Sequence, residues 1–105
     1  MTSQERHSAD DKGPQWTAAI KCSEAGDYVN ALKIFQRLAD QGYVEAFSEI
    51  GKIMELGEGG VETDYTSAAT WYERAITAID DADAHLHMGR LLLAVDWVMK
   101  MPIAL

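Results

Sequence analysis

The sequence has 105 residues, which suits a single domain, and 48% of them are hydrophobic. Its net charge is −8 with only nine basic residues, which disfavours nucleic-acid binding because phosphate contacts need clustered lysine and arginine. The acidic balance favours a basic partner, or it serves solubility alone. A single cysteine excludes an internal disulfide.

The N-terminal stretch MTSQERHSADDKG is polar and lacks a hydrophobic period. We therefore predict a flexible leader over 1–13 and one folded helical-repeat domain over 14–105. The leader lacks the apolar core of a secretory signal peptide, and no stretch reaches the roughly 18 apolar residues of a membrane span. We expect a cytoplasmic protein without membrane association, unless a dedicated secretion system exports it.

Apolar residues recur at helical spacing from Gln15 onward, and no window alternates with a period of two. We therefore predict an all-α fold without strands. Glycine breaks and aspartate N-caps divide the pattern into five helices. The expected ranges run from Gln15 to about Gly26, from Tyr28 (behind the N-cap Asp27) to Gln41, from about Val44 to Leu56, from Asp64 to about Ile79, and from about Ala82 to the residues before Pro102.

The chain repeats itself with a period of 37 to 38 residues. The matching pairs are Asp27 with Asp64, Tyr28 with Tyr65, Ala31 with Ala68, Phe35 with Tyr72, Ala46 with Ala84, Phe47 with His85, Ile50 with Met88, and Gly51 with Gly89. Such a period in a helical chain predicts a short α-solenoid of antiparallel helix pairs. We expect the small residues Ala31, Ala68, Gly51 and Gly89 to let helices approach closely. We expect His85 to be partly buried, like Phe47. The aromatic residues Tyr65, Trp71 and Tyr72 are expected to lie chiefly in the core.

Three segments carry a resemblance to a known family. GEGGVETDYTSAATWYERA, 57–75, resembles the G-x-G-V-x-x-D-Y-x-x-A-x-x-W-Y-x-x-A signature of Sel1-like repeats, with one extra glycine. The A-x-x-x-[IM]-G runs at 46–51 and 84–89 are similar to the first helix of that repeat, and EAGDYVNALKIFQRLADQG looks closer to a tetratricopeptide unit. The resemblance covers 27–92, about two and a half units where a stable stack usually has at least three. It implies protein–protein interaction in adaptor roles.

The glycine-rich run Gly57–Gly60 is interpreted as a turn. A phosphate loop needs Lys followed by Ser or Thr after its last glycine, and a dinucleotide loop needs a glycine where Glu62 stands. The neighbouring acids would also repel a phosphate. We expect Gly57 to end the third helix, Val61 to fill the gap between helices, and Thr63 or Asp64 to cap the fourth helix.

The run DDADAHLH, 80–87, invites a metal-site hypothesis that its spacing disfavours. His85 and His87 point about 200° apart on a helix, whereas zinc-binding pairs on helices are four residues apart. The three aspartates instead suit a helix N-terminus. Cys22 is predicted to face inward and to be inert. We predict no catalytic residue, no metal, no cofactor and no enzymatic activity.

Two surfaces are candidates for partner binding. The first is the concave face, lined in such a solenoid by the first helix of each pair. Its expected residues are Trp16, Glu45, Ser48, Lys52, Glu55, Leu86, Arg90 and Leu93. The alternative is that these are ordinary solvated positions, since few residues anchor any interface.

The second surface is the apolar run RLLLAVDWVMKMPIAL, 90–105, which lacks a following helix to cover it. The residues expected to associate with a second copy are Leu91, Val95, Trp97, Val98 and Met99. A homodimer through this helix is the simplest cover, and a different protein could serve equally. Alternatively the tail folds back onto its own stack, or the chain is a truncated gene product.

These observations together predict a non-catalytic protein–protein interaction module. A sharper version is an inhibitor or immunity protein that neutralises a basic toxin or effector by binding it. The alternative is a regulatory or assembly subunit that docks into a larger complex through its C-terminal helix.

Overall fold

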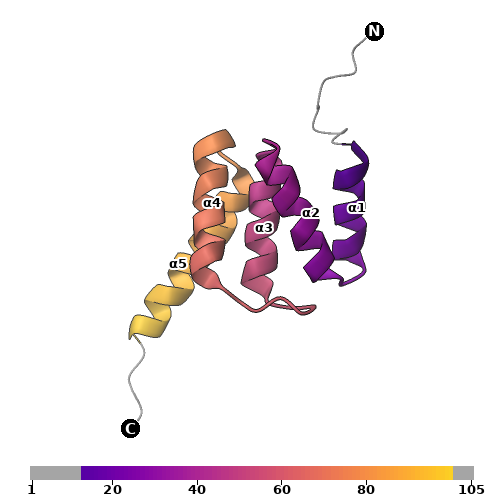
Figure 1. Cartoon of the computed structure of the whole chain (residues 1–105). Helices are drawn as coiled ribbons and strands as arrows, with labels where there is room; N and C mark the ends of the chain where they lie inside the picture. Colours follow the sequence, from indigo (N-terminus) through magenta and orange to yellow (C-terminus); the bar gives the residue numbers. More distant parts are fainter. Residues whose placement is uncertain (1–12, 101–105) are drawn as a thin grey trace.

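The computed structural model describes the backbone of residues 13–100 and the side chains of residues 13–93. In this range the chain forms five α-helices and no strand, which confirms the all-α prediction. The helices are α1 (Gly13–Glu24), α2 (Tyr28–Asp40), α3 (Glu45–Leu56), α4 (Tyr65–Ile79) and α5 (Ala82–Lys100). Each helix packs against the next one in the chain, and α5 also contacts α3. Figure 1 shows α1 to α4 side by side, with α5 crossing behind α4 and extending beyond it.

The first helix begins earlier than expected. Gly13 and Pro14 belong to α1, because a proline is tolerated in the first helical turn, where the N–H groups have no partner within the helix. The helix therefore includes Gly13, the last residue of the predicted leader. The rest of the predicted leader, 1–12, lies outside the described residues.

Aspartate caps set the starts of three helices. The carboxylate of Asp64 accepts hydrogen bonds from the backbone N–H of Ser67 at 3.0 Å and from its hydroxyl at 2.8 Å. These bonds hold the pKa of the Asp64 carboxyl below its ordinary value, because they stabilise the charged form. Asp27 caps α2 in the same way, and Asp81 accepts the backbone N–H of Ala84 in the first turn of α5. The repeated Asp-Tyr pairs are therefore helix starts, as predicted.

The core lies along the interfaces between successive helices, and most of its buried residues come from α2, α3 and α4. Its largest fully buried side chains are Tyr72, Phe35, Leu38 and Ile50. Ala31 and Ala68 are buried, and Gly51 lies under the ring of Tyr72, where a Cβ would be only 2.6 Å from the Tyr72 Cε1 atom. These small residues do permit close helix approach. Gly89 does not, because nothing lies within 4 Å of where its Cβ would be. The prediction for Gly89 is wrong because none of the described helices packs over that side of α5.

The loop between α3 and α4 is a turn that reaches back to the first pair of helices. Gly57 ends α3 in the left-handed conformation, with φ 64°, as expected. Gly59 lies against the carbonyl oxygen of Gly26, so a side chain at Gly59 would strike the backbone of the α1–α2 turn. Figure 1 shows this loop swinging out beneath α2. Val61 is partly buried against the core, as predicted.

Candidate functional site

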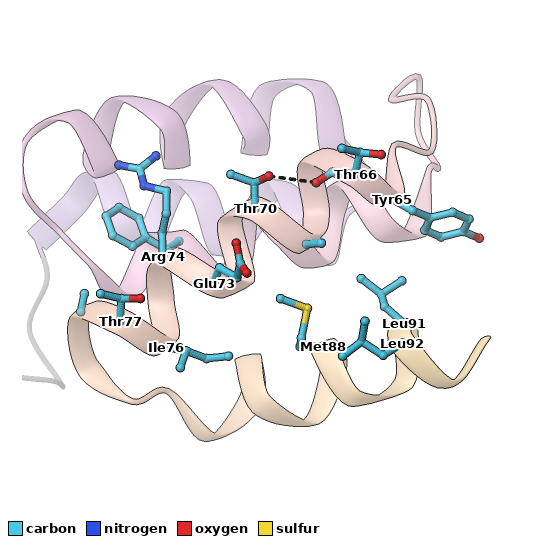
Figure 2. A pocket seen from close by; sticks show the side chains of 13 residues that line it. Tyr65, Thr66, Thr70, Glu73, Arg74, Ile76, Thr77, Met88, Leu91 and Leu92 are labelled. Carbon is cyan, nitrogen blue, oxygen red and sulfur yellow. Dashed lines mark hydrogen bonds between the residues drawn. The ribbon is translucent and has the colours of Figure 1, made fainter. Parts of the chain in front are cut away.

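An open, largely apolar groove lies between α4 and α5, with a volume of about 1200 Å³. Met88, Leu91 and Leu92 form its α5 wall, and Figure 2 shows these side chains rising from α5 toward α4. The α4 wall consists of Tyr65, Thr66, Ala69, Thr70, Glu73, Arg74, Ile76, Thr77 and Ala78, and Phe47 of α3 also lines the groove. The groove therefore exposes apolar surface between the last two described helices.

The C-terminal residues predicted for self-association fall into two groups. Leu91 is buried against the core and is not available to a second copy. The prediction fails for Leu91 because this side of α5 packs on α4. Its neighbour Leu92 is 62% exposed, and Leu86 and Leu93 are also exposed. The side chains of Val95, Trp97, Val98 and Met99 lie outside the described residues, although their backbone belongs to α5.

A polar network centred on Tyr72 occupies the face shared by α3 and α5. The Tyr72 hydroxyl donates a hydrogen bond to Glu55 Oε1 at 2.7 Å. The His87 ring stacks on the Tyr72 ring with centroids 5.5 Å apart, and His87 Nδ1 lies 3.6 Å from Glu55 Oε1. Arg90 Nη1 lies 3.2 Å from the same His87 nitrogen. Burial, and then the hydrogen bond to Glu55, raises the pKa of Tyr72 above its usual range.

Replacing Tyr72 with phenylalanine should cost about 0.5–1.5 kcal/mol of stability near neutral pH, through the lost hydrogen bond. This difference should shrink as the pH rises above the ordinary tyrosine pKa of 10.0. The raised pKa means that Tyr72 keeps its proton in the folded chain and loses it in the unfolded chain above about pH 10. Only the wild type therefore loses the stability that Tyr72 contributes as the pH rises, since the other titrating groups are common to both proteins. Urea unfolding of both proteins from about pH 8 to about pH 11 measures the difference. A constant difference over that range would contradict the raised pKa.

Two residues predicted for the concave face instead support the fold. Ser48 is buried, and its hydroxyl donates to Asp81 Oδ2 at 3.2 Å in the α4–α5 connection. The prediction for Ser48 is wrong because this connection covers that side of α3. Glu55 is half-buried and is the acceptor for Tyr72, so it positions α4 on α3.

The other predicted residues do not form one surface. Lys52 lies 3.3 Å from Glu49 and, with Arg90, lines a smaller hollow of about 370 Å³ between α3 and α5. Glu45 is half-buried at the start of α3. Trp16 belongs to α1, at the opposite end of the stack, and its ring packs edge-on against Phe35 at 5.2 Å. Of the predicted set, the structure brings together Lys52, Glu55 and Arg90, which line this hollow.

Two more residues differ from their expected environments. His85, predicted to be partly buried, has a 54% exposed side chain that lies 2.6 Å from Asp80 Oδ1. Among the described residues, no helix packs over this face of α5, whereas Trp71 of α4 packs against the matching Phe47. Tyr65, expected in the core with Trp71 and Tyr72, is 57% exposed and lines the groove. In the described part of the chain, no three His, Cys, Asp or Glu side chains are grouped as metal ligands.

Sequence reasoning missed the α4 wall of the groove. The signal was present, because the outward face of α4 carries threonines at Thr66, Thr70 and Thr77 where charged residues are usual on a solvated helix. It also missed the contact between Tyr72 and His87, which joins two helices and leaves no local pattern.

Comparisons with protein-family models, with curated proteins and with solved structures give no match. The fold establishes an all-α protein of sequentially packed helices. The resemblance to Sel1-like repeats therefore stands on the motifs quoted above. Among the described helices, none is both long and apolar enough to cross a membrane.

Proposed function

We propose that this protein is a non-catalytic module that binds another protein, and the exposed groove between α4 and α5 is the observation that carries the proposal. Fully burying one exposed leucine side chain favours transfer from water by about 1.5–3 kcal/mol, and part of this gain offsets the cost of association. Exposed apolar grooves bordered by polar side chains are typical of interaction sites. The motifs that resemble Sel1-like repeats favour the same function.

Charge supports a sharper form of this function, in which the protein is an inhibitor or immunity protein for a basic toxin or effector. At a net charge of −8, the chain attracts a basic protein over long range and accelerates the encounter. In this form the groove supplies the buried contacts, and the acidic surface supplies selection among partners.

The exposed leucines on α5 support a second candidate, a regulatory or assembly subunit. Leu86, Leu92 and Leu93 project from a helix that extends past the rest of the stack (Figure 1). Such a helix suits docking into a larger complex. A homodimer through the same helix is a further proposal that the exposed leucines allow.

Affinity capture from cells that express the protein tests the proposed function. We expect a partner that the wild type retains and that the groove variant Thr70→Glu/Leu92→Glu loses, because both positions are exposed and the charges fill the groove. The matched control Ala18→Glu, on the exposed side of α1, should capture normally. A basic partner with a Kd of about 1 nM would favour the inhibitor, and poor solubility without the partner would favour the subunit. Identical capture by all three proteins would contradict the groove as the site.

A further inference from the structure

The chain contains its own example of a helix seated on this kind of face. On α3, the stripe formed by Phe47, Ile50, Gly51 and Met54 is covered by α4. The covering face of α4 consists of Ala68, Tyr72 and Ala75, all fully buried. The Tyr72 ring lies directly on Gly51, because only a residue without a Cβ leaves room for it.

The same stripe recurs on α5 without its cover. The matching residues, 38 positions later, are His85, Met88, Gly89 and Leu92. His85 and Leu92 are exposed, and nothing lies within 4 Å of the Cβ position of Gly89. Met88 and Leu92 form the α5 wall of the groove in Figure 2. The Tyr72 ring fills the space over Gly51 on α3, whereas the matching space over Gly89 on α5 holds no side chain of the described residues.

We propose that the uncovered face of α5 around Gly89, which shares Met88 and Leu92 with the groove, binds an amphipathic helix of a separate, basic protein, whose face repeats that of α4. This face has a small residue, an aromatic residue four positions later and a second small residue three positions after that. The aromatic ring lies over Gly89 and contacts Leu92, as Tyr72 lies over Gly51. The inference rests on the proposed function and specifies the chemistry of the partner. A buried aromatic anchor in a groove is a common centre of binding energy.

Two arguments favour a separate protein as the occupant. One is the charge of this chain, and the other is that the described aromatic face of α4 is already used within the fold. Two copies would each carry −8 and would repel one another, whereas a basic helix is attracted. The α4 face of a second copy is already buried within its own fold. Residues 1–12 and 101–105 contain no Phe, Tyr or Trp, so neither segment can supply a ring like that of Tyr72.

A stapled peptide tests this proposal by fluorescence anisotropy against the full chain. The peptide carries the α4 sequence Tyr65–Ile79, with Glu73 and Thr77 replaced by lysine and a staple on its outward face, because an isolated helix of this length is otherwise marginal. We expect Tyr72→Ala in the peptide to weaken binding about tenfold or more. Gly89→Leu in the protein, which fills the empty slot, should weaken binding to a similar extent.

The matched control Ala18→Leu adds the same side chain on the exposed face of α1 and should leave binding unchanged. Circular dichroism of Gly89→Leu should match the wild type, because the added side chain meets open space. A peptide with glutamate at the two lysine positions should bind more weakly, and added salt should reduce that difference.

Each contrary outcome has a separate meaning. If neither Tyr72→Ala in the peptide nor Gly89→Leu in the protein changes the affinity, the aromatic ring does not bind over Gly89 and the proposal is wrong. Absence of peptide binding, with partner capture still lost in the groove variant, overturns this inference and leaves the proposed function standing. If the peptide does not bind and the groove variant captures the partner normally, both this inference and the proposed function are overturned. A dimer in light scattering that Gly89→Leu dissociates would assign the Gly89 face of α5 to a second copy and overturn the proposal.

Discussion

Replacing Tyr72 with alanine should lower the free energy of unfolding by about 3–5 kcal/mol, the range for removing a large aromatic side chain from a core. Tyr72 is 0% exposed, and its ring lies between Gly51 of α3 and His87 of α5. Its hydroxyl also holds Glu55. One side chain therefore joins α3, α4 and α5, and its removal leaves a cavity where the three helices meet.

The matched control is Tyr65→Ala, the same chemical change on the same helix. Tyr65 is 57% exposed, so its replacement should change stability by no more than about 0.5 kcal/mol. Urea unfolding followed by circular dichroism measures both variants. Equal losses for the two tyrosines would contradict the central place of Tyr72 in the core.

The second expected result is a pair of glycine substitutions with opposite signs. Glycine to alanine within a helix normally stabilises by about 0.5–1 kcal/mol, because alanine restricts the unfolded chain and favours the helix. At Gly89 nothing opposes this gain, so Gly89→Ala should stabilise by that amount. At Gly51 the new methyl group meets the Tyr72 ring at 2.6 Å, and overpacking costs about 1–3 kcal/mol. Gly51→Ala should therefore destabilise the protein.

Thermal and urea unfolding of the two variants measures the pair. A double-mutant cycle adds a sharper check, since the cost of Gly51→Ala should disappear in a Tyr72→Ala background, where the ring is absent. Stabilisation by both alanines would show that the Tyr72 ring moves aside freely. Destabilisation by both would show that a further contact covers Gly89.

The helices were predictable because their boundaries are encoded by adjacent residues. The carboxylates of Asp27 and Asp64 cap backbone groups three residues away, and Gly57 adopts the conformation that ends α3. Such signals act within one turn and need no knowledge of the rest of the fold. The start of α1 was missed because Gly-Pro also occurs in loops, and only the structure shows Pro14 in the first turn.

The environments of single residues were less predictable, because they depend on neighbouring helices. Matching His85 to Phe47 assumed that both have the same cover, yet α4 covers only the latter. Ser48 was placed on an open face because its bond to Asp81 spans 33 residues of sequence. The apolar character of the α5 wall was visible in the sequence, whereas its partner wall on α4 required the packing of two helices.

The loop that brings Gly59 against the α1–α2 turn affects the cooperativity of unfolding. In a stack held only by contacts between neighbouring helices, units at one end can unfold while the others persist. Here the connection that precedes α4 rests on the turn that precedes α2, so separation of the first two helices also removes the support of that connection. The α1–α2 pair and the α3–α4 pair are thereby coupled, and their unfolding should be more cooperative than that of a linear array of the same helices.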